Sequence, residues 1–201
     1  MAPARPLSLK ASKLLIQLFR LCWLAPVKVA EDERIVRAIY SPFHVDKHDR
    51  LKHQAYHPTP KTDEISVMRL EYMGATLCRR KARSFENPAK KKEYSGFAVL
   101  RAATVCSHGM QIVDSRRYFC GHADIRLMME ELANRESDEP LSPEVGKRLK
   151  DLKERLVKAS TFISDPHPRA CNLKSHQFLS KIEGQVNLVG DERPVGTELP
   201  S

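Results

Sequence analysis

The spacing of apolar and polar side chains along the chain predicts several strands in its middle part. Apolar and polar residues alternate over 65–72, as in a strand with one buried face. Residues 33–40 are rich in β-branched side chains, which strands favour. An almost unbroken apolar run over 97–105 predicts a central strand, and another short strand begins at 110–113. These segments lack the regular helix alternation of a parallel sheet, so we expect a mainly antiparallel sheet.

The clearest helical patterns lie on either side of these strands. Apolar residues recur at helical spacing over 8–24, and Pro26 ends that segment. Ser142 and Pro143 supply an N-cap and a proline at the first helical position, which predicts a helix from 142 to 159. Weaker patterns predict helices over 74–83 and 125–134 and a last strand over 182–189. The fold class expected is α+β, a small antiparallel sheet over 33–125 with flanking helices.

The length of 201 residues suits one domain with appendages. We expect an apolar N-terminal helix or extension over 1–30, a single α+β domain over 31–190 and a frayed tail over 191–201. The N-terminal apolar run is shorter than the ~20 residues of a membrane span, and Arg20 interrupts it. The five cysteines are odd in number and widely spaced, which favours a reducing compartment. The chain is therefore predicted to be cytoplasmic, with no membrane span.

The net charge of +9 is concentrated in the first half of the chain. Residues 1–100 hold 19 Lys and Arg against 10 Asp and Glu, whereas the second half is balanced. Such a basic stretch is suited to nucleic acid or to an acidic partner, with affinity that salt weakens. The alternative is a solvated loop. The densest part consists of Arg79, Arg80, Lys81, Arg83, Lys90, Lys91 and Lys92.

Two Cys-x-His pairs are the candidate metal ligands. They are Cys106 with His108 and Cys120 with His122. In a strand, residues two apart point to the same face, so neighbouring strands would bring four zinc ligands together. The spacing matches no standard zinc motif, and buried cysteines are common in cores, so the prediction remains no metal and no cofactor.

Histidines provide the candidate catalytic residues. His44, His48, His53 and His57 are clustered in a polar segment, where functional groups are often displayed. His122 and Asp124 would share one face of a strand and could form an acid–base pair. The alternative for Asp124 is an N-terminal position beside a helix. No nucleophile elbow, phosphate-binding loop or dinucleotide-binding pattern occurs in the chain.

The apolar N-terminal segment is a candidate interface with a protein partner. It contains Leu15, Leu18, Phe19 and Trp23, the single tryptophan. Exposed apolar patches mark interfaces, and tryptophan is enriched among the residues that dominate binding energy. The alternative is that this helix packs on its own sheet.

The order of several short motifs resembles a group of small, uncharacterised bacterial proteins encoded in operons with larger partners, including defence-type operons. The motifs are RAIYSPFH at 37–44, AYHP at 55–58, KTDEISV at 61–67 and GHADI at 121–125, and the similar stretch covers about residues 33–126. The resemblance implies a bacterial, cytoplasmic accessory protein and assigns no catalytic residue.

A second resemblance is to ADP-ribosyltransferase cores. It rests on Arg34 or Arg37 in a first strand and Ser66 in the next. The sequence departs from that pattern at the expected acid of a third strand, which neither Glu93 nor Asp124 clearly provides. Because no catalytic spacing is recognisable, the predicted function is a non-catalytic subunit that binds a larger protein. The alternatives are a hydrolase or transferase that uses the histidine-rich segment with His122 and Asp124, and a nucleic-acid-binding protein.

Overall fold

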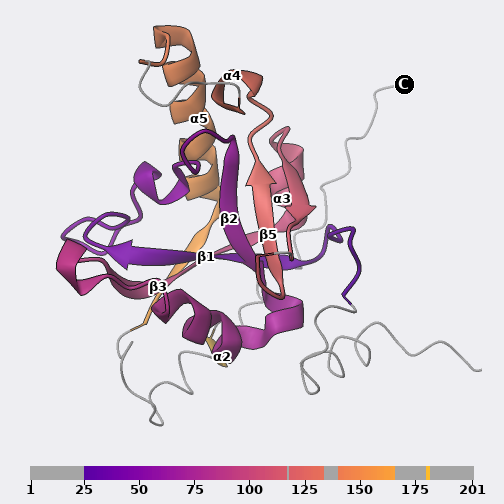
Figure 1. The fold of residues 1–201 in the computed structure, drawn as a ribbon, viewed down its shortest axis with the longest axis vertical. Coiled ribbons are helices and arrows are strands. Elements are labelled where there is room, and N and C mark those ends of the chain that lie inside the picture. Colours follow the sequence, from indigo (N-terminus) through magenta and orange to yellow (C-terminus); the bar gives the residue numbers. More distant parts are fainter. Residues whose placement is uncertain (1–24, 117, 134–139, 166–179, 182–201) are drawn as a thin grey trace, which may run out of the picture.

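The computed structural model describes residues 25–116, 118–133, 140–165 and 180–181. Its centre is a six-stranded sheet in the order β4-β5-β2-β1-β3-β6 (Figure 1). Every neighbouring pair of strands is antiparallel. The fold is therefore α+β, as predicted. The strands are β1 (Arg34–Ser41), β2 (Glu64–Arg69), β3 (Glu93–Arg101), β4 (Gln111–Asp114), β5 (His122–Arg126) and β6 (Thr161–Ser164).

The central strands are paired over very different lengths. β1 pairs with β3 along its whole length, from Arg34 to Ser41. It pairs with β2 at only two positions, Ile35 with Arg69 and Val36 with Met68. Beyond Val36 the two strands cross at a wide angle (Figure 1). A gap therefore opens in the middle of the sheet between β1 and β2.

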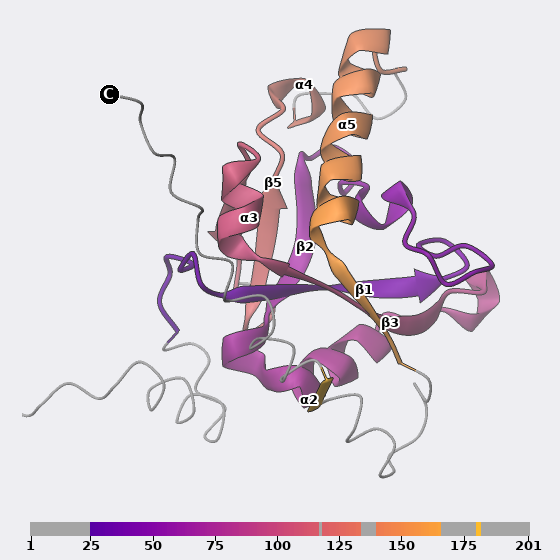
Figure 2. The same ribbon diagram turned by 180° about the vertical axis from the view of Figure 1, so that it is seen from behind.

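Different elements cover the two faces of the sheet. The helix α2 (Leu70–Arg83) lies on one side of β1, and α3 (Ala102–Ser107) and α5 (Pro143–Ala159) lie on the other (Figure 2). The α2 side holds a buried cluster that includes Val36, Tyr40 and Phe97. A larger cluster on the α5 side includes Ile35, Ile39 and Leu156. The alternation along β1 is what places these apolar side chains on opposite faces.

The helix predicted over 142–159 is confirmed as α5. The hydroxyl of Ser142 accepts a hydrogen bond from the Val145 amide, and Pro143 occupies the first turn. Leu149 and Leu156 are buried on the side that faces the sheet. The short helix η2 (His53–Tyr56) contacts α5 and closes that side of the core. Within the described residues, no helix combines the length and apolarity that crossing a membrane requires.

Three predicted elements differ from the structure. The strand expected over 65–72 ends at Arg69, where α2 begins. The strand expected over 97–105 ends at Arg101, where the chain turns into α3. The helix expected over 125–134 is wrong at its start, because Ile125 lies in β5. Met128 has a φ of 57°, which interrupts any helix there and leaves only α4 (Glu130–Ala133). The segments 8–24 and 182–189 lie outside the described residues.

Candidate functional site

A pocket of about 290 Å³ opens where β1 and β2 separate. Most of its lining residues lie on the side of the sheet that α2 covers, whereas Arg37 belongs to the opposite face of β1, with Ile35 and Ile39. β1, β2 and the start of β5 form its floor. The end of α2 and the segments around residues 44, 85, 92 and 119 form its walls. The lining residues are Val36, Arg37, Ala38, Tyr40, His44, Ser66, Val67, Met68, Ala82, Phe85, Lys92, Phe119 and His122. None of them is acidic, so the pocket presents positive charge.

Arg37 spans the gap between the two strands. Its Nε donates to the Ala55 carbonyl at 3.1 Å, and its Nη1 donates to the Ser66 carbonyl on β2 at 2.6 Å. The second bond satisfies a β2 carbonyl that faces the gap, and the first ties β1 to the short helix η2. Burial lowers the pKa of Arg37, but a guanidinium stays charged in proteins. Its hydrogen bonds go to neutral carbonyls, and although the Asp124 carboxylate interacts with it electrostatically, Arg37 forms no ion pair that would neutralise its charge towards a ligand.

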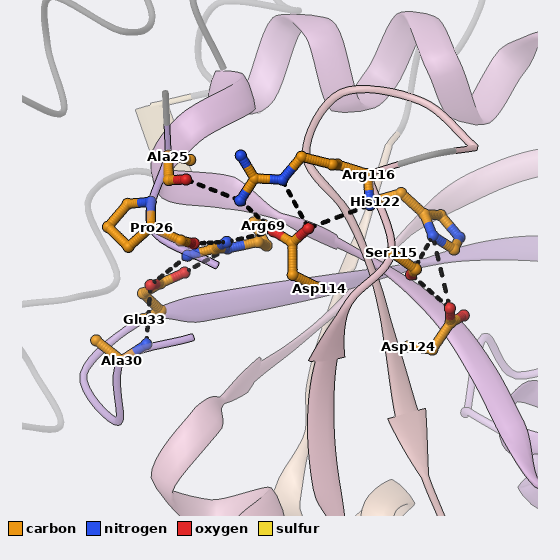
Figure 3. Close-up of polar contacts among 10 residues, drawn as sticks. All are labelled: Ala25, Pro26, Ala30, Glu33, Arg69, Asp114, Ser115, Arg116, His122 and Asp124. Atoms are coloured by element: carbon orange, nitrogen blue, oxygen red, sulfur yellow. Dashed lines mark hydrogen bonds and ion pairs between the residues drawn. The ribbon is translucent and has the colours of Figure 1, made fainter. Parts of the chain in front are cut away.

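His122 is held in one tautomer by the residues behind it. The Ser115 hydroxyl donates its single proton to Asp124 Oδ2 at 2.5 Å and lies 2.7 Å from His122 Nδ1 (Figure 3). Since that proton is used, Nδ1 must carry a hydrogen and donate it to Ser115. Burial lowers the pKa of His122, although Asp124 opposes the shift. The neutral ring therefore has Nε2 as an unprotonated acceptor.

His44 has the opposite tautomer. Its Nδ1 accepts a hydrogen bond from the Tyr40 amide at 3.3 Å, which leaves the hydrogen of the neutral ring on Nε2. Burial, with Arg37 and Lys92 nearby, lowers the pKa of His44 to about 4, although a hydrogen bond with the Ala38 backbone opposes the shift. At neutral pH the pocket therefore contains one histidine that donates through Nε2 and one that accepts through Nε2.

Lysine and aromatic side chains surround the mouth of the pocket. The Lys92 ammonium lies 4.2 Å from the centre of the Tyr40 ring, and burial lowers its pKa. The Lys81 ammonium lies 4.8 Å from the centre of the Phe85 ring and 4.5 Å from that of Phe119. Phe85 is 47% exposed. The mouth therefore combines cations with accessible aromatic surface.

A second, shallower hollow adjoins the pocket. Its lining consists of Phe43, His44, Gln54, Lys90 and Lys92, so the two cavities share His44 and Lys92. It again contains no acidic residue, and Phe43 is half exposed. The Glu86 carboxylate, which interacts electrostatically with Tyr40, accepts a hydrogen bond from the Tyr94 amide. Together the cavities form a basic surface that is longer than either one.

A buried ionic network supports the residues behind His122. Arg69 pairs with Glu33 at 2.7 Å and with Asp114 at 2.7 Å, and Arg116 pairs with Asp114 at 2.7 Å (Figure 3). Arg69 and Arg116 also donate to the carbonyls of residues 26 and 25. Since Asp114 directly precedes Ser115, this network fixes the turn that orients the His122 ring.

The structure brings together most of the predicted catalytic candidates. His44 and His122 line one pocket, and Asp124 lies behind His122. Asp124 belongs to the middle of β5 and not to a helix terminus. His57 lines a different cavity, with Leu149 and the segment 58–62, and burial lowers its pKa. His57 is therefore not part of this site.

The predicted basic stretch is divided between several environments. Arg79 is buried and paired with Asp165 at 2.7 Å, so it does not contribute to the exposed basic surface of the free protein. Lys92 lines both cavities, Lys90 lines the second, and Lys81 covers the phenyl rings. Arg80 and Lys91 are exposed, and Arg83 is partly buried.

The predicted metal ligands are not assembled. Cys106 lies in α3 and not in a strand, so it does not share a strand face with His108. Cys120 is disulfide-bonded and is therefore not a thiolate ligand. Among the described residues, no three His, Cys, Asp or Glu side chains are grouped to hold a metal ion.

The candidate residues of the transferase resemblance also lie in different parts of the structure. Arg34 is paired with Glu71 at 2.8 Å, whereas Arg37 and Ser66 line the pocket. Glu93 is exposed at the start of β3. The proposed interface residues, Leu15, Leu18, Phe19 and Trp23, lie outside the described residues, so the protein-partner role stays a prediction.

The sequence analysis missed Ser115, Phe85 and Phe119 as site residues. Ser115 is seven residues from His122, and only the β4–β5 pairing brings their side chains together. Arg37 was considered only through the resemblance to ADP-ribosyltransferases. The sequence signal for it is its position between Ile35 and Ile39, because a charged residue is unusual on a strand face that is otherwise buried.

Comparison with known proteins gives no match: no family model fits the chain, and no curated protein or solved structure is significantly similar to it. The pocket is therefore the feature from which a function can be inferred.

Proposed function

We propose that the chain binds single-stranded nucleic acid, with a backbone phosphate in the pocket between Arg37 and Lys92. The observation that supports this proposal most strongly is the recessed guanidinium of Arg37, whose hydrogen bonds go only to neutral carbonyls in a pocket without carboxylates. A partly buried cation of this kind favours an anion, and a guanidinium is well suited to phosphate oxygens.

The neighbouring groups add to the case for a phosphate. His44 presents an Nε2 hydrogen, and Lys92 presents an ammonium group, so two further donors accompany Arg37 at one pocket. A phosphate diester has two non-bridging oxygens and can accept all these bonds. A lone carboxylate has no tetrahedral centre to which donors from several walls could converge.

The aromatic side chains favour an unpaired strand. Proteins that bind single strands combine a positively charged groove with aromatic rings on which bases stack, each worth ~1–3 kcal/mol. Phe85 lies at one end of the basic surface and Phe43 at the other, and both are about half exposed. Lys90 and Lys92 lie in the hollow next to Phe43. A strand that crosses both cavities would have phosphate partners and stacking partners.

The test is fluorescence anisotropy with a labelled single-stranded oligonucleotide over a range of salt concentrations. Arg37→Gln should weaken binding by about tenfold or more, and Lys92→Gln should weaken it and reduce the salt slope by about 1. Arg148→Gln is the matched control, since Arg148 is an exposed arginine of α5 on the other side of the sheet. If Arg37→Gln and Arg148→Gln bind equally well, the pocket is not the binding site.

A further inference from the structure

His122 is placed as a base in the pocket that the proposed function assigns to a phosphate. Its Nδ1 donates to Ser115, which in turn donates to the buried Asp124. Figure 3 shows these polar contacts. The His122 ring also makes T-shaped contacts with Tyr118 and Phe119, whose ring centres lie 5.2 and 4.7 Å from its own. Nε2 is the ring atom that is left to act on a ligand. A site that only binds a phosphate would not need a hydrogen-bond acceptor such as His122 Nε2, held in a fixed orientation among cationic side chains.

We propose that this pocket cleaves RNA by attack of the ribose 2′-hydroxyl on the adjacent phosphate, with His122 as the general base. The inference rests on the proposed function, because the phosphate must first lie against Arg37. An acceptor such as Nε2 has no favourable contact with a phosphate oxygen, but it can accept the hydrogen of a hydroxyl beside that phosphate. Only the 2′-hydroxyl of RNA provides such a group next to each phosphate.

The nucleophile in this reaction comes from the substrate. The pocket contains no cysteine or threonine, and its one serine, Ser66, has no hydrogen bond to His122, whose Nδ1 is bonded to Ser115 instead. The Tyr40 hydroxyl donates to the Ala82 carbonyl at 2.9 Å. The walls also offer no acidic side chain that would hold a metal ion beside the phosphate. Intramolecular attack by the 2′-oxygen needs neither group, because the reacting oxygen is already attached next to the phosphorus.

The proton and bond changes balance within the pocket. The 2′-oxygen gives its proton to His122 Nε2 and forms a bond to phosphorus, while the bond between phosphorus and the 5′-oxygen breaks. Arg37 and the Nε2 hydrogen of His44 stabilise the charge on the non-bridging oxygens. The Lys92 ammonium gives a proton to the departing 5′-oxygen. The products are a 2′,3′-cyclic phosphate and a 5′-hydroxyl, and solvent then restores both side chains to their starting states.

Ser115 and Asp124 are positioning residues in this scheme. When His122 gains a proton, it becomes an imidazolium whose Nδ1 hydrogen still points to Ser115, and the Asp124 carboxylate 3.7 Å away stabilises its charge. General-base catalysis contributes about 10²–10⁴-fold to a rate. Ser115→Ala should therefore lower the cleavage rate and shift the acidic limb of its pH profile, without preventing RNA binding.

The experiment uses a labelled single-stranded oligoribonucleotide, its 2′-O-methyl counterpart and excess EDTA. The full chain should cleave the RNA, leave a 2′,3′-cyclic phosphate end and bind the methylated strand without cutting it. His122→Gln should reduce cleavage at least about 100-fold while retaining binding of the methylated strand, and His57→Gln should behave as wild type. Lys92→Arg keeps the positive charge but is a far weaker acid, so it too should bind and cleave slowly.

Each failure has a separate meaning. If the chain binds the methylated strand but leaves RNA intact, the cleavage inference is wrong and the binding proposal stands. If it binds neither strand, both are wrong. Cleavage that persists in both His122→Gln and Lys92→Arg, or that also cuts the methylated strand, would overturn the assigned mechanism. Because Lys92 is at the pocket wall and not in the core, its variant keeps the test decisive if His122→Gln fails to fold.

Discussion

Replacing Arg69 by methionine should be among the most destabilising single substitutions in the chain. The Arg69 guanidinium has no solvent exposure and binds Glu33 through two hydrogen bonds of 2.7 and 2.9 Å. It also donates to Asp114 at 2.7 Å. Methionine would fill part of the space but would leave the buried Glu33 carboxylate without a cation.

The expected magnitude follows from this geometry. Breaking a buried ion pair by removing one partner costs about 3–5 kcal/mol. Asp114 keeps its bonds to Arg116, so the main loss comes from Glu33, and we expect about 3 kcal/mol. The stability of a domain this size is only about 5–15 kcal/mol, so Arg69→Met should remove a large part of it.

Equilibrium unfolding in urea measures this difference. The matched control is Arg126→Met, because Arg126 pairs with Glu64 on the same sheet but is 45% exposed. Exposed pairs contribute about 0–1 kcal/mol. The double variant Glu33→Gln with Arg69→Met should recover part of the lost stability, since no buried charge remains at that position. A loss for Arg69→Met no larger than for Arg126→Met would refute the reasoning.

Two further predictions concern stability and pH. Gly96 has a φ of 153°, and a Cβ there would collide with the Ile163 carbonyl on β6, so Gly96→Ala should lower the thermal midpoint by several degrees and weaken amide protection along β6. The pKa of His44 is about 4 in the folded protein, against the ordinary value of 6.5. The free energy of unfolding should therefore be highest above pH 6.5 and should fall by up to about 3 kcal/mol as the pH drops towards 4. His44→Gln should flatten urea-unfolding stability over that range, whereas a slope as steep as that of the exposed-site variant His48→Gln would contradict the assignment.

The groups that face His44 explain why its pKa should fall. Burial is the largest cause, and the cationic Arg37, Lys92 and Lys52 also oppose its protonation, whereas a hydrogen bond with the Ala38 backbone favours it. Tyr40 contributes its backbone amide to Nδ1, which also favours the neutral ring. No carboxylate lines either cavity beside His44. Anion binding should accordingly strengthen below pH 5, because a protonated His44 adds charge to the pocket.

Local patterns in the sequence predicted most of the sheet. Alternation marked β2, β-branched residues marked β1, and the Ser142–Pro143 cap marked the start of α5. β6 was not predicted, because four residues carry too little alternation and the strand depends on pairing with β3. The length of β3 was overestimated because the helix α3 continues the same apolar run beyond Arg101.

The site was harder to predict than the fold because its residues come together through the topology. His44 and His122 belong to segments nearly eighty positions apart and meet only because β1 and β2 separate beside β5. The density of positive charge in the sequence does not distinguish Arg79 from Lys92, which belong to the same basic stretch. In the structure Arg79 is paired with Asp165, whereas Lys92 lines the pocket. Sequence identifies the chemical groups, and the register of the strands decides which ones share a pocket.

The most direct measurement is a crystal structure of the chain with a short 2′-O-methyl oligoribonucleotide, which can bind but cannot be cleaved. We predict a phosphate within hydrogen-bonding distance of the Arg37 guanidinium and the Lys92 ammonium, with a base against Phe85 or Phe43. The 2′-oxygen next to that phosphate should face His122 Nε2. A strand that instead lies along the exposed Arg80 and Lys91, with the pocket empty, would contradict the account.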